Sequence, residues 1–224
     1  MTAVAEETYA WPGWPLEANP YGAEFDLAAR KRMVAGGRAL SPFLDQYRSR
    51  LGRVILEVGP FFTPLVVPDE FTESIVVYWD NDPHVLKWLA ERHDAGRALP
   101  MRCSFGDIEN PAVACTLRRH LAGAGVHSPG VDSAIMSQVL NYVDFRWFLT
   151  AIHGYVKPGG HIFVNNVVDY GLPPHFSERR PRSIQHTLQV IGETGYTVVE
   201  HATLDTPDAR YQKNERLIVV ATRP

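Results

Sequence analysis

The pattern of hydrophobic and polar positions divides the chain at about residue 53. Beyond that point, short runs rich in β-branched and aromatic residues alternate with longer amphipathic stretches. Such runs predict buried strands. The predicted strands cover residues 53–58, 74–79, 99–104, 131–136, 161–167, 196–202 and 217–222.

Helix start signals stand between several of these strands. Asp82 and Asn110 each precede a proline, which combines an N-cap residue with a proline in the first turn. Asp144 and Ser183 provide capping chemistry without that proline. The helices predicted from these signals cover residues 83–93, 111–121, 145–155 and 184–191.

This alternation predicts an α/β fold with a doubly wound, seven-stranded sheet. Strands separated by helices form right-handed βαβ units, so the sheet should be mostly parallel. The last two strands are separated only by the mainly polar residues 204–215, which favours an antiparallel hairpin at one edge. The segment KPGG at residues 157–160 predicts a turn before the fifth strand.

The residues before 53 have a different pattern, which is helical and follows an aromatic stretch rich in proline. Helical periodicity covers residues 27–35 and residues 41–52, and glycines end both. The chain is therefore predicted to consist of two units, residues 1–52 and residues 53–224.

Composition and charge exclude several classes of protein. A net charge of −3 over 224 residues provides no positive field to attract nucleic acid. No apolar run approaches the ~20 residues that span a bilayer, and the N-terminus lacks the apolar region of a signal peptide. Two cysteines are too few for a disulfide framework or a structural zinc site. We therefore expect a soluble, cytoplasmic protein with neither nucleic-acid nor membrane partners.

Candidate chemistry lies where the predicted strands end, because doubly wound sheets bind ligands beyond the carboxyl ends of their strands. The first strand leads through Glu57 to Gly59, and the second ends at Asp80. Asp80 follows Gly59 by 21 residues, a spacing typical of an acid that binds a ribose diol. Phe61 and Thr63 stand where a dinucleotide fingerprint needs further glycines, so the loop does not favour a pyrophosphate.

Five segments resemble the motifs of class I S-adenosylmethionine-dependent methyltransferases, in the same order along the chain. The first three motifs are similar to LEVGPFFTP, YWDNDPHVLKWL and FGDIENP. The fourth is similar to VDSAIMSQVLNYVD, and the turn and strand that follow it resemble YVKPGGHIFV. The resemblance extends from about residue 53 to the C-terminus. It implies a Rossmann-like methyltransferase fold, S-adenosylmethionine as cofactor and methyl transfer as the activity.

The resemblance also implies a role for individual residues at the strand ends. Glu57 would lie near the methionine amino group, and Gly59 would let the backbone approach the cofactor. Asp80 would bind the ribose hydroxyls, and Asp107 would recognise adenine. The complete set of implied cofactor-binding residues is Glu57, Gly59, Pro60, Asp80, Asn81, Asp107, Ile108, Ser137 and Gln138.

Local structural roles compete with some of these assignments. Glu57 could bond to its own loop, and Asp107 could cap a turn before Asn110. Asp80 competes with Asp82, but an aspartate directly before a proline is best suited to the helix cap, which leaves Asp80 for the ribose.

Residues after the fourth and fifth strands are the candidates for acceptor chemistry. The catalytic candidates are Asn141, Tyr142, Asp169 and His175, of which Asp169 and His175 are the best general bases. The substrate-contacting candidates are Trp11, Trp14, Tyr21, Asn165, Asn166 and Tyr170. The adjacent amides Asn165 and Asn166 lack the acid expected of a metal-dependent site, so we expect no metal.

The methyl acceptor is predicted mainly by excluding classes of substrate. No Asn-Pro-Pro-Tyr-like run follows the fourth strand, and no inserted recognition domain is present. A small molecule or a short peptide is therefore the expected substrate. The sequence is also compatible with a homodimer. The N-terminal aromatic residues Tyr9, Trp11, Trp14 and Tyr21 could close over the site as a lid. Alternatively, Trp11, Trp14 and Phe25 could simply pack this segment on the core.

Two alternatives of other functional classes remain at this stage. The loop with Phe61 and Thr63 favours a non-catalytic methyltransferase-like interaction subunit. An NAD(P)-dependent oxidoreductase shares the acid after the second strand, but the missing glycines and the antiparallel last strand oppose it.

Overall fold

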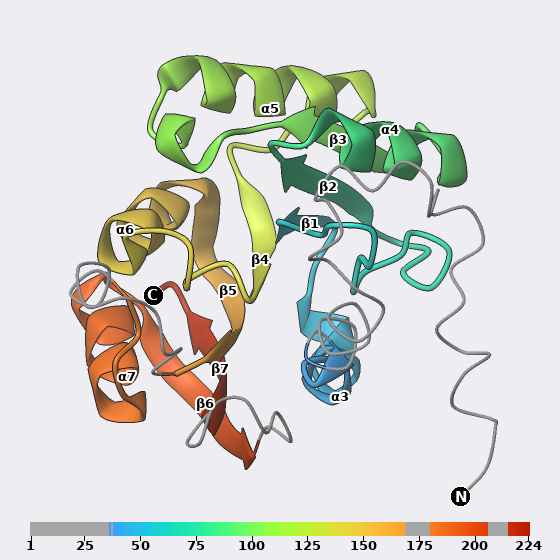
Figure 1. The fold of residues 1–224 in the computed structure, drawn as a ribbon. Coiled ribbons are helices and arrows are strands. Elements are labelled where there is room, and N and C mark those ends of the chain that lie inside the picture. Colours follow the sequence, from blue (N-terminus) through green and yellow to red (C-terminus); the bar gives the residue numbers. More distant parts are fainter. Residues whose placement is uncertain (1–35, 37, 169–179, 206–214) are drawn as a thin grey trace, which may run out of the picture.

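The computed structural model describes residues 36, 38–168, 180–205 and 215–224, and within them a seven-stranded sheet is flanked by helices (Figure 1). The strands are β1 (Val54–Val58), β2 (Ile75–Asp80), β3 (Ala98–Arg102), β4 (Val131–Ser137), β5 (Val156–Val167), β6 (Thr197–Asp205) and β7 (Glu215–Thr222). The helices are α3 (Ser41–Gln46), α4 (Pro83–Arg92), α5 (Pro111–Gly123), α6 (Phe145–Tyr155) and α7 (Ile184–Glu193), with short 3-10 turns η2 (Arg48–Arg50) and η3 (Phe105–Asp107).

The strand order of the sheet is β3-β2-β1-β4-β5-β7-β6. Strands β1 to β5 pair in parallel, whereas β7 is antiparallel to both β5 and β6. The predicted mostly parallel sheet with an antiparallel hairpin is therefore confirmed, and β7 lies between β5 and β6. The winding direction reverses between β1 and β4, which makes this pair the topological switch point where such sheets bind ligands.

Two hydrophobic cores cover the two faces of the sheet. Alternate residues of each strand point to opposite faces, so Leu56 of β1 lies in one core and its neighbour Ile55 in the other. Helices α5, α6 and α7 cover the face of Leu56, and α3 and α4 cover the face of Ile55.

The four predicted helix starts are confirmed, together with their caps. Side chains of Asp82, Asn110, Asp144 and Ser183 accept hydrogen bonds from backbone N–H groups in the first turns of α4, α5, α6 and α7. Each cap therefore satisfies a donor that the helix itself leaves unpaired.

The predicted turn at residues 157–160 is wrong, because these residues belong to β5. Val131 pairs with Val156, whereas Ser133 pairs with His161, so the extra residues form an irregularity in the ladder. Glycines make this possible: Gly159 has a φ of 77°, and a Cβ on Gly160 would stand 2.6 Å from the carbonyl oxygen of Asp132.

The helix predicted for residues 41–52 is shorter than expected. Helix α3 ends at Gln46 because Tyr47, with a φ of −97° and a ψ of 11°, leaves the helical path. The Tyr47 ring instead packs edge-on against Phe163 of β5, and its hydroxyl donates to Glu200 of β6. Tertiary packing has overridden a local helical pattern here. The helix predicted for residues 27–35 lies outside the described residues.

The connection between β1 and β2, residues 59–74, contains no helix. Three of its apolar side chains, Phe62, Val66 and Phe71, are buried in the core that α3 and α4 cover. A loop therefore shields the part of the sheet that a crossover helix would otherwise cover. None of the described helices is long and apolar enough to span a bilayer.

Candidate active site

The loop after β1 turns back at once towards the end of β2. Gly59 has a φ of 62°, and its N–H donates to the carbonyl oxygen of Trp79 at 2.8 Å. Phe61 also has a positive φ, 53°, which is uncommon for a residue with a side chain. The backbone thus keeps a left-handed conformation at the position where a glycine would be expected. Pro60 stands between the two residues and is buried.

Asp80 joins the ends of β1 and β2. One of its carboxylate oxygens accepts from the N–H of Asp82 at 3.0 Å, and the other faces the N–H of Phe61 at 3.4 Å. The side chain is only 7 % exposed, and burial raises its pKa. Asp82 caps α4 as predicted, through the N–H of His84. The N–H of Asn81 also contributes a hydrogen bond, so within the described residues Asp80 retains some acceptor capacity for a ligand, since a carboxylate has about four acceptor positions. The neighbouring Asn81 is exposed.

Glu57 organises the β1–β2 connection. Its two carboxylate oxygens accept from the N–H groups of Leu65 and Val66, at 2.8 and 3.1 Å. Burial raises the pKa of Glu57 to about 8, against the opposite effect of these two hydrogen bonds. Both oxygens therefore bond to the loop that follows β1, which is the local role considered for Glu57 in the sequence. Contact between Glu57 and the cofactor stays a prediction.

The loop after β3 presents Asp107 to solvent. Asp107 ends the 3-10 turn η3, its side chain is exposed, and within the described chain its carboxylate has no hydrogen bond or ion pair. Ile108 beside it is buried in the core, and its carbonyl accepts from the hydroxyl of Tyr155 at 2.5 Å. The predicted adenine contact would therefore use the Asp107 side chain.

A polar cluster occupies the end of β4, β5 and the beginning of β7. Asn165 donates to the hydroxyl of Ser137 at 3.0 Å and to the carbonyl of Gly36 at 2.6 Å, and its oxygen accepts from Arg216 at 2.8 Å. Gln138 follows Ser137 with a φ of 62°, and its N–H donates to the carbonyl of Asn165. The cluster holds the strand ends together next to the switch point.

Arg216 in this cluster was missed by sequence reasoning. Its side chain is 6 % exposed, although arginine is rarely buried. The available signal was a charged residue at the start of an apolar strand (ERLIVVAT). Such a residue is ordinarily a solvated strand end. Only the antiparallel pairing of β7 with β5 brings it next to Asn165.

Asn166 and Asn141 form a second, separate pair. Asn166 donates to the side-chain oxygen of Asn141 at 2.7 Å, and both residues are buried. Among the described residues, the side-chain oxygen of Asn166 has no hydrogen-bond partner. In this arrangement the pair braces the strand ends, and the roles predicted for both amides in acceptor chemistry stay predictions. Tyr142 beside Asn141 is 63 % exposed.

The other acceptor-side candidates lie outside the described residues. These are the catalytic candidates Asp169 and His175 and the substrate candidates Trp11, Trp14, Tyr21 and Tyr170. Within the described residues, no group of three His, Cys, Asp or Glu side chains could hold a metal ion.

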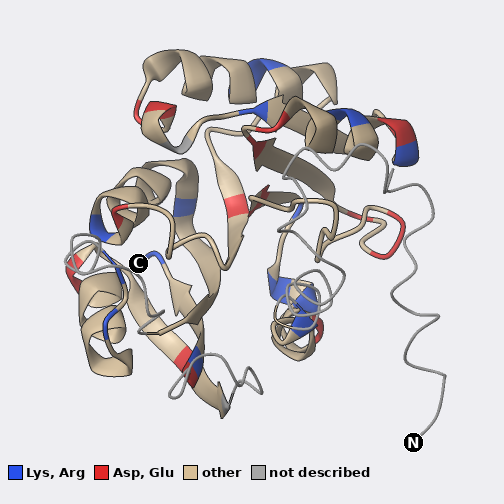
Figure 2. Cartoon of the chain, in the orientation of Figure 1, with Lys and Arg blue, Asp and Glu red and all other residues tan. Residues whose placement is uncertain are grey.

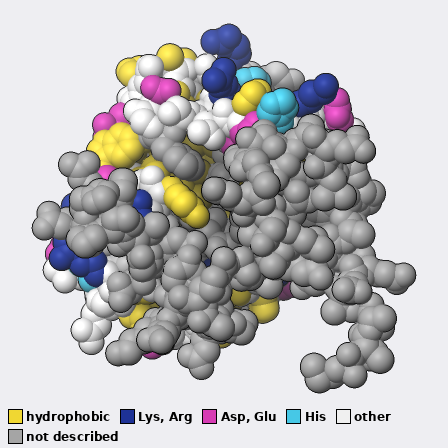
Figure 3. All heavy atoms as spheres, viewed as in Figure 1, with side chains coloured by type: hydrophobic (Ala, Val, Ile, Leu, Met, Phe, Trp, Pro, Cys, Tyr) yellow, Lys and Arg dark blue, Asp and Glu magenta, His cyan; other side chains and the backbone are white. Residues whose placement is uncertain are grey.

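Charged residues occur on most of the elements around the site. Positive and negative side chains of the described residues are interspersed over the helices (Figure 2). Hydrophobic side chains appear on the same view of the surface next to segments that are not described (Figure 3).

Comparison with solved structures identifies the fold as that of the class I S-adenosylmethionine-dependent methyltransferases. One similar structure is the 1,6-didemethyltoxoflavin-N1-methyltransferase of Burkholderia thailandensis, with bound S-adenosylhomocysteine (17 % identity, TM-score 0.61, 85 % of this chain and 79 % of that chain). Another is the N-methyltransferase NodS of Bradyrhizobium japonicum (15 % identity, TM-score 0.56, 93 % and 99 %). A third is the [4+2]-cyclase SpnF (13 % identity, TM-score 0.61, 82 % and 80 %). No protein-family model and no curated protein sequence matches the chain.

Proposed function

We propose that the protein is an S-adenosylmethionine-dependent methyltransferase that acts on a small molecule or a short peptide. The observation that carries this proposal is the position of Asp80. A buried carboxylate with unused acceptor positions lies at the carboxyl end of β2, next to a left-handed turn after β1 and beside the β1/β4 switch point. Ribose diols bind to an acid in this position.

The residues that the structure describes fit such a cofactor. Asp80 would accept from the ribose hydroxyls, and Asp107, which has no described partner, would accept from the adenine amino group. The cofactor would supply a methyl group on a sulfonium that is already an excellent leaving group. The protein therefore mainly has to hold the acceptor in line, because proximity and alignment alone lower the barrier.

The cellular compartment and the biological role of the enzyme are part of the same proposal. Both cysteines, Cys103 and Cys115, are unpaired, which is typical of a reducing compartment and supports a cytoplasmic enzyme. One structural neighbour is described as acting during echinomycin biosynthesis, which supports a biosynthetic role. The general base, if the acceptor needs one, would come from the segment that holds Asp169 and His175.

Calorimetric titration of the full chain with S-adenosylhomocysteine and with NAD⁺ tests the proposal. We expect one S-adenosylhomocysteine to bind per chain and NAD⁺ not to bind. The reverse result would favour the oxidoreductase alternative, and no binding of either ligand would favour an interaction subunit without a cofactor.

A second candidate function is a methyltransferase-like protein that does not transfer methyl groups. Phe61 in place of a loop glycine supports it, and a structural neighbour described as a [4+2]-cyclase has the same fold. Cofactor binding together with no consumption of S-adenosylmethionine over a broad panel of small acceptors would favour this candidate.

A further inference from the structure

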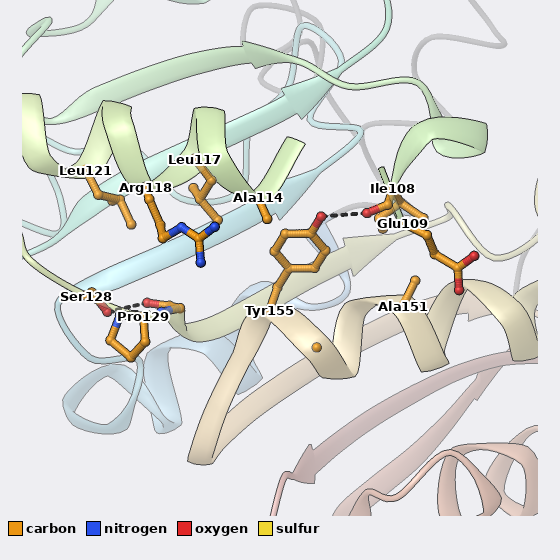
Figure 4. Close-up of a pocket in the computed structure, with 12 residues that line it drawn as sticks. Ile108, Glu109, Ala114, Leu117, Arg118, Leu121, Ser128, Pro129, Ala151 and Tyr155 are labelled. Carbon is orange, nitrogen blue, oxygen red and sulfur yellow. Dashed lines mark hydrogen bonds between the residues drawn. The ribbon is translucent and has the colours of Figure 1, made fainter. Parts of the chain in front are cut away.

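A cavity lies between α5 and α6, on the face of the sheet that these two helices cover. Its volume is about 310 Å³, which is within the range of small-molecule sites. The apolar part of its lining comes from Ala114, Leu117 and Leu121 of α5 and from Ala151 of α6, and polar groups form about as much of the lining. The ring of Tyr155 closes one side of the space (Figure 4).

Arg118 supplies the one cationic group among the residues that line this cavity. Figure 4 shows its guanidinium group and the Tyr155 ring on either side of the same space. Within the described chain, no carboxylate lies within 4.0 Å of this guanidinium, and its hydrogen bond goes to the thiol of Cys115, at 3.5 Å. A thiol is a weak acceptor, so among the described residues this solvent-exposed guanidinium has no carboxylate partner.

The other polar side chains that line the cavity either form hydrogen bonds within the protein or point away from the Tyr155 ring. The hydroxyl of Tyr155 donates to the carbonyl of Ile108, and the hydroxyl of Ser128 donates to the carbonyl of Gly130. Glu109 also lines the cavity, but its carboxylate lies at the far end and is directed away from Tyr155 in Figure 4. The space thus combines an apolar side, which Leu117 and the Tyr155 ring form, with one guanidinium that has no carboxylate partner in the described chain.

From this arrangement we infer that the cavity between α5 and α6 is a second binding site, for a small organic carboxylate with a flat apolar body. The body would pack between the Tyr155 ring and Leu117, and the carboxylate would accept from Arg118, whose planar group pairs well with carboxylates. The site does not depend on the proposed methyl transfer. Ile108 is the one lining residue that also belongs to the implied cofactor-binding set, and its side chain is buried in the core.

The probes that test this inference are indole-3-carboxylate and its neutral analogue indole-3-carboxamide. Each is titrated into the ¹⁵N-labelled full chain, and amide shifts are followed by NMR. We expect the carboxylate to shift amides of α5, of α6 and of Ser128 and Gly130, and the carboxamide to bind about tenfold more weakly, since it lacks the charge-assisted hydrogen bond. Equal affinity for both probes would overturn the role of Arg118. Shifts confined to Gly59 and Asp80, or none at millimolar concentrations, would overturn the site.

Matched variants make the test specific. Arg118→Met should weaken binding of indole-3-carboxylate about tenfold, while Arg119→Met, one position along the same helix and outside the cavity, should not change it. Glu109→Gln should also leave the affinity unchanged. An Arg118→Met variant that binds as well as the unmodified chain contradicts the inference.

A cavity-filling pair controls for folding. Gly154 of α6 lines the cavity, and a Cβ there would meet nothing within 4 Å, so Gly154→Leu should fill the space without a clash. Gly192 is the equivalent penultimate residue of α7, also with open space around it. Gly154→Leu should abolish binding and Gly192→Leu should preserve it. Retained binding in a folded Gly154→Leu variant would place the probe elsewhere.

Discussion

Individual carboxylates at the strand ends have different environments, and their environments set what each can do. Glu57 and Asp80 are both buried, and burial raises the pKa of both. Both oxygens of Glu57 accept hydrogen bonds from backbone N–H groups of one loop. Asp80 links two loops and, among the described residues, keeps acceptor positions for a ligand. The first is therefore mainly an architectural residue, and the second is the better ligand-binding residue.

Replacing Asp80 tests this division. Asp80→Asn keeps an oxygen for the N–H of Asp82 but removes the charge, so we expect the affinity for S-adenosylhomocysteine to fall by about 1.5–3 kcal/mol, roughly tenfold or more. The measurement is calorimetric titration. Asp82→Ser is the matched control, because serine preserves the helix cap two residues away. Equal affinities in both variants would show that Asp80 does not hold the ribose.

The raised pKa of Glu57 predicts a dependence of stability on pH. A carboxyl with an ordinary value of 4.5 and a folded-state value of about 8 favours the folded state most below pH 4.5, and this contribution is lost as the pH rises towards 8. Glu57→Gln cannot ionise. Urea unfolding at several values between pH 5 and 8 should therefore show the unmodified chain losing stability relative to Glu57→Gln as the pH increases. Parallel curves for the two proteins would mean that Glu57 ionises normally.

At the scale of elements, the β1–β2 connection is the unusual part of the fold. It covers its part of the sheet without a helix and is held near its middle: Glu57 accepts from Leu65 and Val66, and the hydroxyl of Tyr78 donates to the carbonyl of Val66 at 2.6 Å. Buried Phe62 and Phe71 complete it. Specific side-chain bonds thus replace the repeating hydrogen bonds of a helix.

Removing the Tyr78 hydroxyl should loosen this connection. Tyr78→Phe leaves the buried carbonyl of Val66 without its donor, at a cost of about 1–3 kcal/mol in the free energy of unfolding. Hydrogen exchange at Leu65 and Val66 should accelerate as well. Tyr155→Phe removes a comparable bond, to the carbonyl of Ile108 on the other face, and serves as the control. Acceleration in both variants would indicate a general loss of stability rather than a local one.

Local signals in the sequence were sufficient for most elements. An aspartate or asparagine before a proline is a short-range signal, and α4 and α5 begin at the predicted residues. Long-range contacts were not predictable in this way. Tyr47 leaves its helix to contact Phe163 and Glu200, and Arg216 meets Asn165 only because β7 pairs with β5. Such contacts depend on strand order and register, which local patterns do not encode.

At the scale of the whole molecule, the described residues before β1 are tied to the last strands of the sheet. The carbonyl of Gly36 accepts from Asn165 of β5, and Tyr47 and Gln46 donate to Glu200 of β6. A Cβ on Gly36 would stand 2.5 Å from the guanidinium of Arg216, so the backbone lies directly against this arginine. Early and late parts of the chain therefore share one buried polar junction beside the proposed site.

Asn165 is the centre of that junction, and its replacement tests how far the whole fold depends on it. Asn165→Leu has a similar size but removes the acceptor of Arg216 and the donor of the Gly36 carbonyl, both in a buried environment. We expect the free energy of unfolding to fall by about 2–4 kcal/mol in urea denaturation, since buried polar groups that lose partners are costly. Asn81→Leu, at an exposed strand end, should change it by much less. Because the junction joins residues far apart in sequence, the loss should appear in one cooperative transition. An Asn165→Leu variant as stable as Asn81→Leu would mean that the core alone holds these segments together.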